Sequence, residues 1–203
     1  MIKKIVLIAI ALVSFLSVET QAAISEDVVK ESIVKHSMEM GVDPALALSI
    51  AKKESGFKHE LKSPYGAVGV FQVLPSTAKK IGYNPYYLNE NIKAGLTYYK
   101  MMYEMFGSTE LALAAYNAGP GNVKKYGGNI PPFKETKRFV NVIMSDYHQQ
   151  KMNPDPVITK FANKAAIAPD AKTEVVNSQK SVDLPDLTEI PEVRQDETAM
   201  EIL

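Results

Sequence analysis

Glu54 is the residue whose type and position in this sequence best fit catalytic chemistry. On a helical projection with Leu46 at zero, Glu54 falls at about 80°, while Ala47, Ile50 and Ala51 fall at about 100°, 40° and 140°. A carboxyl group in the middle of an apolar arc is partly buried, and because burial disfavours the charged form, its pKa rises. A raised pKa suits a general acid, although a glutamate on an apolar face can also be a purely structural group.

Polar side chains beside glycine-marked breaks form a second group of candidates. Gly66 and Gly69 let the backbone approach a ligand closely, and the Gln72 amide can donate or accept hydrogen bonds. Tyr116 and Asn117 lie where a helical pattern breaks into a Gly-Pro-Gly loop. Each glycine can equally mark a plain turn, but together these groups favour a polyhydroxylated ligand over an apolar one.

Other chemistries find little support in the 203 residues. The chain has no cysteine, and therefore no thiol nucleophile, thiolate metal site or disulfide. His36, His59 and His148 lack metal-ligand spacing and are expected at the surface. No EF-hand, phosphate-binding loop or G-x-S-x-G motif occurs, and the lysines are scattered rather than arranged in a stripe. We expect no metal, no cofactor and no nucleic-acid partner.

A mainly helical domain over residues 25–150 is expected to position the candidate groups. Asp43 followed by Pro44 should cap the helix that carries Glu54, and Ser25 should cap the preceding helix. Apolar periodicity and breakers predict further helices at residues 75–82, 92–106, 110–117 and 133–147. Only residues 66–73 have the pattern of an extended segment, such as a small hairpin.

Residues 1–22 have the pattern of a signal peptide. Lys3 and Lys4 precede an apolar stretch over residues 5–15, and small residues end at Ala22, so that cleavage is expected after Ala22 or the next residue. The stretch is short for a membrane span of ~20 residues, although an uncleaved anchor is the alternative. Without a nearby cysteine, no lipid-modified N-terminus is expected.

The last part of the chain, residues 153–203, is acidic and rich in proline. It carries five basic and ten acidic side chains, a net charge of −5, which leaves +4 on residues 23–152. Such a composition buries too little apolar surface to offset the entropy of ordering, so we expect a disordered tail with at most a short helix. A mildly basic exported domain suits an acidic extracellular polymer, although solubility alone also explains the charge.

Several sequence blocks follow one another between residues 29 and 147. They are Glu54-Ser55; Ser63-Pro64-x-Gly66-Ala67-x-Gly69-Val70-Phe71-Gln72-Val73-Leu74-Pro75; Asn91-Ile92-x-x-Gly95-x-x-Tyr98; Ala114-Ala115-Tyr116-Asn117-Ala118-Gly119-Pro120-Gly121; and Pro132-Phe133-Lys134-Glu135-Thr136 with Phe139-Val140. In this order they resemble the soluble lytic murein transglycosylase family. That family has a lysozyme-like, mainly helical fold and cleaves the β-1,4 bond between N-acetylmuramic acid and N-acetylglucosamine in peptidoglycan.

The resemblance implies roles for individual residues. It makes Glu54 the catalytic acid, and it implies a substrate groove bordered by Ser63, Gln72, Tyr116, Asn117 and Glu135. Two positions depart from the family pattern: Phe71 stands where a methionine is common, and Phe139 stands where a tyrosine usually follows the Glu-Thr pair. These departures affect sugar contacts, including any hydrogen bond from a tyrosine hydroxyl, and leave the acid intact.

The family mechanism also explains why a second catalytic carboxylate is missing. Ordinary glycosidases use two, about 5–5.5 Å apart for retention or about 6.5–9.5 Å for inversion. Here no aspartate occurs between Asp43 and Asp146, and neither the Glu54 block nor the Gln72 block contains a second acid. In the family a single glutamate protonates the departing oxygen and then activates the 6-hydroxyl of muramic acid. The product is a 1,6-anhydro sugar formed without water.

We expect an exported, periplasmic lytic transglycosylase that acts as a monomer on peptidoglycan glycan strands. A small catalytic domain with a tail resembles the specialised members that open the wall for envelope-spanning secretion, conjugation or pilus complexes. One alternative is a lysozyme-type muramidase that releases reducing ends through water. The other is a non-catalytic peptidoglycan-binding assembly factor whose tail recruits machine components, although an intact Glu54 argues against a purely binding role.

Overall fold

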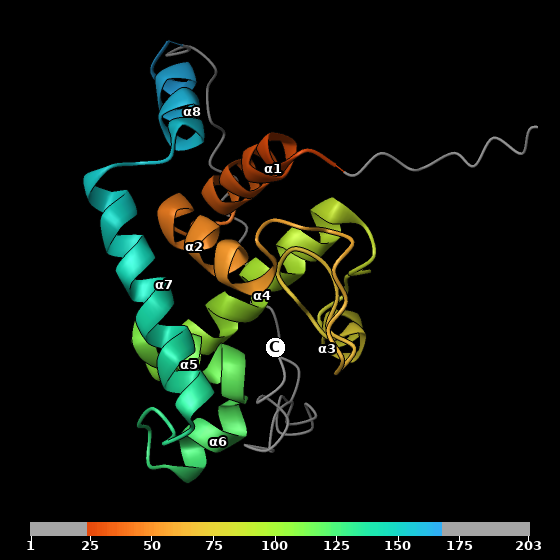
Figure 1. The fold of residues 1–203 in the computed structure, drawn as a ribbon, viewed down its shortest axis with the longest axis vertical. Coiled ribbons are helices and arrows are strands. Elements are labelled where there is room, and N and C mark those ends of the chain that lie inside the picture. Colours follow the sequence, from red (N-terminus) through yellow and green to blue (C-terminus); the bar gives the residue numbers. More distant parts are fainter. Residues whose placement is uncertain (1–23, 168–203) are drawn as a thin grey trace, which may run out of the picture.

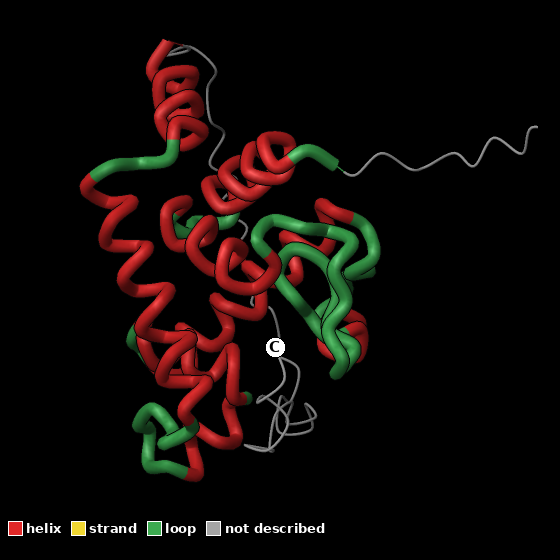
Figure 2. The backbone as a smooth tube through the Cα atoms, viewed as in Figure 1, coloured by secondary structure: helices red, strands yellow, loops and turns green. Residues whose placement is uncertain are grey.

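A computed structural model of the chain describes residues 24–167, which form eight helices joined by turns (Figures 1 and 2). The helices are α1 (Glu26–Glu39), α2 (Pro44–Ser55), α3 (Pro75–Lys80), α4 (Leu88–Phe106), α5 (Thr109–Ala118), α6 (Pro120–Lys125), α7 (Lys134–Met152) and α8 (Pro156–Ile167). The prediction of a mainly helical fold is therefore confirmed. The predicted signal peptide, residues 1–22, lies outside the described residues.

The predicted extended segment is very small. Val68 forms an isolated antiparallel bridge with Val73 and another with Lys62, and within residues 24–167 no longer strand forms. The chain between α2 and α3 is thus mostly irregular, and side chains from the surrounding helices hold it in place, as described for the site below.

Both α1 and α2 start where predicted, but only α2 has the predicted side-chain cap. Asp43 Oδ1 accepts a hydrogen bond of 2.9 Å from the backbone N–H of Ala45, and Pro44 is the first helical residue. Ser25 occupies the capping position of α1, but its side chain makes no capping hydrogen bond, so that part of the prediction was wrong. Two acidic residues in the first turn, Glu26 and Asp27, instead complement the positive end of this helix.

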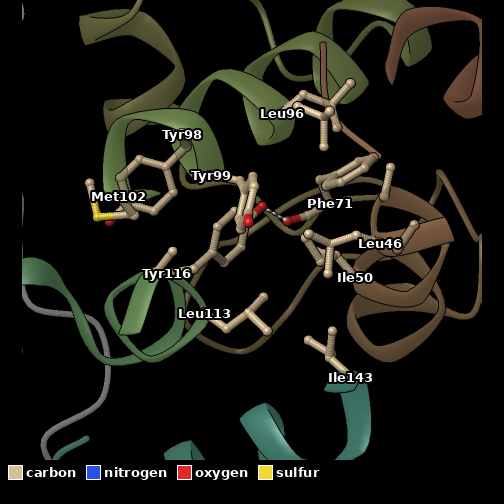
Figure 3. Close-up of a cluster of buried hydrophobic side chains, with 14 of the residues drawn as sticks. Leu46, Ile50, Phe71, Leu96, Tyr98, Tyr99, Met102, Leu113, Tyr116 and Ile143 are labelled. Carbon is tan, nitrogen blue, oxygen red and sulfur yellow. Dashed lines mark hydrogen bonds between the residues drawn. The ribbon is translucent and has the colours of Figure 1, made fainter. Parts of the chain in front are cut away.

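The core lies where α2, α4, α5 and α7 pack together, with α1 covering α2 and α4. Its largest fully buried side chains are Phe71, Phe139, Ile33, Leu48, Ile50, Ile92, Leu96, Met102, Leu113 and Ile143. Phe71 comes from the irregular segment rather than from a helix, and in Figure 3 its side chain lies between Leu96 of α4 and Leu46 of α2. The segment that precedes Gln72 is therefore part of the core.

Two glycines make room for this segment. A Cβ atom on Gly95 of α4 would lie 2.3 Å from the Phe71 side chain, and one on Gly69 would lie 2.3 Å from the Asn91 amide nitrogen. Real Cβ atoms do not come this close to other atoms, so both positions depend on the missing side chain.

Helix α8 lies in the part of the chain that was predicted to be disordered. Residues 156–167 form a helix that packs on α1, with Val157, Ile158 and Phe161 partly buried against the core. Asp155 caps it by accepting a hydrogen bond of 2.9 Å from the N–H of Val157. The prediction allowed a short helix in this tail but did not expect one that packs on the domain, because averaging over the acidic composition hid one short amphipathic segment. The remainder of the predicted tail, residues 168–203, lies outside the described residues.

Two further predictions were wrong. Pro120 and Gly121, read as part of a Gly-Pro-Gly loop, instead begin the short helix α6, and proline is already shaped for the first helical position. His36, expected at the surface, is 6% exposed, because it lies on the inward face of α1 near the start of α4. Its ring nitrogens are 2.9 Å from Glu39 Oε2 and 3.3 Å from Asn89 Oδ1.

No helix within residues 24–167 has the length and apolar character that crossing a membrane would require.

Candidate active site

Glu54 lies in the last turn of α2, which ends where Gly56 adopts a left-handed backbone conformation. Ala47, Ile50 and Ala51 on the same face are fully buried, and the Glu54 side chain is partly buried, as the helical projection predicted. The predicted rise in the Glu54 pKa stays a prediction.

The negative charge of the Glu54 carboxylate acts on Tyr116 of α5. Burial, the Glu54 charge and Tyr98 together raise the pKa of Tyr116 well above its usual value. The phenol therefore stays protonated at ordinary pH. Its hydroxyl donates a hydrogen bond of 2.8 Å to the Phe71 carbonyl, drawn in Figure 3. The neutral phenol thus binds Phe71, the residue that precedes Gln72, and is itself within electrostatic reach of the Glu54 carboxylate.

Three helices hold this segment at three of its residues, Val68, Val70 and Phe71. From α2, Ser55 Oγ donates to the Val70 carbonyl at 2.8 Å. From α4, Asn91 Oδ1 accepts from the Phe71 N–H at 2.9 Å, while its amide nitrogen donates to the Val68 carbonyl. Tyr116 of α5 supplies the third contact. Because these partners lie on separate helices, the position of the following residue, Gln72, depends on how the helices pack.

Gln72 itself adopts an unusual backbone conformation, with φ of 45°. A left-handed conformation costs a non-glycine residue of the order of 1–2 kcal/mol. The Gln72 amide offsets part of this strain by donating to the Gly69 carbonyl at 2.8 Å and to the Leu61 carbonyl at 3.1 Å. Since both donated bonds go to the backbone, the side-chain oxygen is the atom left to accept a hydrogen bond from a ligand.

Ser63 has a comparable role at the other side of the segment. Its hydroxyl accepts a hydrogen bond of 3.0 Å from the Ala67 N–H, and its own N–H donates to the Ala67 carbonyl at 2.9 Å. These contacts close a turn and leave the hydroxyl hydrogen available to a ligand.

Asn117 carries the clearest unmet hydrogen-bonding capacity in the site. Its side-chain oxygen accepts a bond of 2.9 Å from the Thr136 hydroxyl in the first turn of α7. Its amide nitrogen is buried and has no hydrogen-bond partner among the described residues. A buried donor without a partner costs about 1–3 kcal/mol, so this N–H group is suited to a ligand oxygen.

Glu135 lies beside α2 and is paired with a lysine. Lys53 Nζ is 3.6 Å from Glu135 Oε1 and 5.5 Å from the centre of the Phe139 ring. Phe139 in turn stacks on Tyr116, with ring centres 6.4 Å apart. This row of contacts joins the end of α2, the end of α5 and the start of α7.

The structure therefore connects the residues singled out from the sequence through short chains of contacts. Gln72 follows the residue bound by Tyr116, Asn117 binds the residue after Glu135, and Lys53 joins Glu135 to the helix of Glu54. Sequence reasoning missed Lys53 and gave no separate role to the buried side chains of Ser55, Asn91 and Thr136. The one available signal was their position within or directly beside the sequence blocks described above, next to the candidate residues. Within residues 24–167, no group of histidine, aspartate and glutamate side chains is arranged to hold a metal ion.

Known proteins resemble this chain over the region that carries the site. The soluble lytic murein transglycosylase of Escherichia coli K12 is 34% identical over 143 residues, which cover 58% of this chain and 22% of the relative. The transglycosylase of Enterobacteria phage PRD1 is 29% identical over 159 residues, covering 78% of this chain and 57% of the relative. The chain thus spans about a fifth of the length of the Escherichia coli relative.

Solved structures agree with the sequence relatives. The 70 kDa soluble lytic transglycosylase of Escherichia coli superposes with a TM-score of 0.54 and 30% identity, over 63% of this chain and 25% of that one. A complex of the 70 kDa soluble lytic transglycosylase with bulgecin A gives a TM-score of 0.55 and 28% identity, over the same shares of the two chains. An inactive glutamate-to-glutamine mutant of Slt from Pseudomonas aeruginosa gives 0.54 and 28%, over 62% of this chain and 25% of that one.

The family model of the transglycosylase SLT domain matches residues 31–139, from the middle of α1 to the first turns of α7. The match contains all six candidate site residues and leaves α8 outside. Because it covers more than half of the sequence, the chain belongs to the transglycosylase SLT domain family.

Proposed function

We propose that this protein is a lytic transglycosylase that cleaves the β-1,4 bond between N-acetylmuramic acid and N-acetylglucosamine in peptidoglycan. One observation carries the proposal: the Glu54 carboxylate acts electrostatically on Tyr116, and the next residue, Asn117, presents a buried amide donor without a partner. A general acid beside an unfilled hydrogen-bond donor suits a ligand with many oxygen atoms.

In the proposed reaction Glu54 donates its proton to the glycosidic oxygen as the bond to the anomeric carbon breaks. The resulting carboxylate takes the proton of the muramic acid 6-hydroxyl, whose oxygen closes onto the anomeric carbon. One 1,6-anhydro end and one free 4-hydroxyl form, water is not consumed, and Glu54 is protonated again. The Asn117 amide and the Gln72 oxygen hold sugar groups, while Tyr116 keeps its proton and supports the segment.

Glu135 is assigned a positioning role rather than that of a second catalytic acid. It lies beside Lys53 in an ion pair, which leaves its carboxylate engaged with a cation. The relatives support a lytic reaction, since they are named soluble lytic murein transglycosylases, and the Pseudomonas structure is of a glutamate-to-glutamine mutant described as inactive.

The cellular setting is also proposed. Residues 1–22 direct the protein to the periplasm, where it acts as a monomer on glycan strands and opens the wall locally for an envelope-spanning secretion, conjugation or pilus complex. The support for export is the pattern of these residues, and the wall-opening role rests on the resemblance described under Sequence analysis.

The test is digestion of purified peptidoglycan, followed by chromatography and mass spectrometry of the muropeptides. We expect anhydromuropeptides, lighter by one water than the products of a muramidase. The Glu54→Gln variant should lose about 10²–10⁴-fold in rate while keeping its fold. Glu60→Gln, an exposed glutamate nearby, is the matched control and should keep full activity.

Reducing N-acetylmuramic acid ends would instead identify a muramidase. Binding without products would identify an assembly factor.

A further inference from the structure

The turn that follows Glu54 contains a strained aromatic residue. Phe57 has a backbone φ of 66°, in the left-handed region that a bulky side chain rarely adopts. It follows Gly56, which ends α2 with a φ of 58°, and its side chain is 8% exposed within the core. Strain of this kind persists only where the surrounding structure holds it. The contacts of Phe57 therefore bear on how α2 ends and on where Glu54 lies.

Lys30 of α1 makes one of these contacts. Its Nζ lies over the Phe57 ring, 4.9 Å from the ring centre, where the negative face of the ring attracts a cation. The Lys30 side chain is 18% exposed, and this attraction is stronger for a partly desolvated ammonium than for one in open water. Lys30 thus holds the ring of the strained residue from the side of α1.

Two carboxylates hold Lys30 in this place. Glu26, one turn earlier in α1, lies 2.7 Å from the lysine Nζ, and Asp155, directly before α8, lies 3.2 Å from it. Burial acts to lower the pKa of Lys30, but hydrogen bonds to Glu26 and Asp155 outweigh it and raise the pKa above its ordinary value. The ammonium therefore keeps its charge at ordinary pH.

Asp155 connects this contact to α8. One of its oxygens, Oδ1, caps α8 by accepting a hydrogen bond of 2.9 Å from the Val157 N–H, and the other, Oδ2, pairs with Lys30. Helix α8 lies beside α1 and packs on it (Figure 1). The start of α8 is thus linked through one lysine to the turn that follows Glu54.

We propose that Lys30 and Asp155 are positioning residues for this turn, and that α8 thereby belongs to the catalytic unit. Asp155 fixes the ammonium, the ammonium holds the Phe57 ring, and the held ring keeps the strained end of α2 in place. Lys30, Asp155 and the whole of α8 lie outside residues 31–139, the part matched by the family model. The effect on catalysis rests on the proposed function, whereas the hold on the turn does not.

A second ion pair in the same interface provides a matched comparison. Lys160 of α8 binds Glu31 of α1 with an Nζ–Oε1 distance of 2.5 Å. Within residues 24–167, the cation that lies over the Phe57 ring is Lys30. Loss of either lysine charge removes one link between α1 and α8, but only loss of the Lys30 charge should act on the turn.

The first experiment is amide hydrogen exchange of the purified full chain, measured at Gly56 and Lys58. Their N–H groups donate to the carbonyls of Lys52 and Ser55, at 3.0 and 3.3 Å. Exchange at these two amides reports how often the turn opens, and it requires neither substrate nor activity.

We expect Lys30→Met, which keeps an apolar side chain and loses the charge, to exchange roughly 3–10-fold faster at both amides. Lys160→Met should leave both rates unchanged. Lys30→Arg should restore the original rates, because a guanidinium also pairs with carboxylates and stacks on rings. Unchanged exchange in Lys30→Met, or equal acceleration in the two methionine variants, would overturn the proposal.

Asp155→Asn tests the link from the side of α8. Asparagine still caps a helix, so the change removes the charge that faces Lys30 and keeps the start of α8. We expect exchange at the two amides to be roughly 2–5-fold faster. The double variant with Lys30→Met should exchange no faster than Lys30→Met alone, because both changes act through one contact. Additive acceleration would show that the two residues act separately and would overturn the link.

Steady-state digestion of soluble peptidoglycan strands tests the effect on catalysis. We expect kcat of Lys30→Met to fall roughly 3–10-fold with KM within about two-fold, since a misplaced acid weakens the transition state more than substrate binding. Lys160→Met should keep the original kcat. Faster exchange with an unchanged kcat would overturn the positioning role in catalysis. If the unchanged chain has no lytic activity, the proposed function fails, and the exchange rates still decide whether α8 holds the turn.

Discussion

The two polar atoms of the Asn117 side chain differ in their bonding: the oxygen makes a structural hydrogen bond, and the nitrogen is open to a ligand. Its oxygen is bound to Thr136, while its nitrogen carries buried donors with no partner among the described residues. A protein that kept this donor for stability alone would carry an uncompensated desolvation cost. Under the proposed function a sugar oxygen would fill this position, where the donor is already buried and oriented.

Replacing Asn117 by alanine should therefore harm activity more than stability. We expect kcat/KM to fall roughly 10–100-fold, the equivalent of about 1–3 kcal/mol for one buried hydrogen bond. Steady-state kinetics on peptidoglycan and a urea titration measure the two effects. Thr136→Val is the matched control: it removes the other end of the same bond, should lower the free energy of unfolding by about 1 kcal/mol, and keeps the Asn117 donor. Equal losses of activity in both variants would contradict a ligand-directed role.

The segment between α2 and α3 shows how helices place residues that have no regular structure of their own. Ser55, Asn91 and Tyr116 bind two adjacent residues of this segment from three helices. These hydrogen bonds hold the segment in place because their side-chain partners lie on packed helices. Gln72 is held in a strained conformation for the same reason, since the chain on its N-terminal side cannot move to relax it.

Gly95→Ala should disturb this arrangement from the core side. The added methyl group would lie 2.3 Å from the Phe71 side chain, so Phe71 or α4 must shift. Overpacking of this kind costs about 1–3 kcal/mol, and we expect the thermal midpoint to fall accordingly. Because Gln72 follows Phe71, activity per folded molecule should fall too. Gly82→Ala is the control. Its methyl group meets no atom within 4 Å, but its backbone φ of 84° strains an alanine, so stability should fall while activity per folded molecule stays unchanged.

Local signals explain which elements could be predicted from the sequence. Asp43 and Pro44 define the start of α2 within two residues, and the position of Glu54 on the buried face follows from helical spacing. The same reasoning failed for His36 and for α8, because their environment comes from helices far along the chain. Asn91 and Lys53 could not be assigned for the same reason: their partners lie 20 and 82 residues away.

At the scale of the whole molecule, α2 and α7 are joined by two carboxylates with lowered pKa values. Burial acts to raise the pKa of Asp43 and Asp146, but hydrogen bonds outweigh it and hold both below the ordinary value of 3.8. The donors to Asp43 are Lys151, the backbone of Ala45 and Tyr147; those to Asp146 are Lys52, Gln150 and Ser49.

These contacts should make the protein acid-sensitive. A carboxylate with a lower pKa in the folded chain stabilises the fold above its unfolded pKa of about 3.9, and this contribution is lost as the pH falls through that range. We expect the free energy of unfolding, measured with urea, to decline between about pH 5 and pH 3. Asp146→Asn should be less stable at pH 6 and show a shallower decline. Glu104→Gln, on an exposed face, should match the unchanged chain. An undiminished slope in Asp146→Asn would contradict the assignment.

The pairing of distant helices also sets when the site can exist during synthesis. Ser49 binds Asp146 across 97 residues, Lys151 binds Asp43 across 108, and Lys160 binds Glu31 across 129. Contacts so far apart in sequence form late, since the intervening chain must be closed first. A chain emerging from its N-terminus presents Glu54 early but lacks the helix that carries Glu135 and Thr136 until the whole of α7 has followed. If the protein is exported and cleaves the wall as proposed, its site would thus stay unassembled until nearly the entire domain had passed through the export channel.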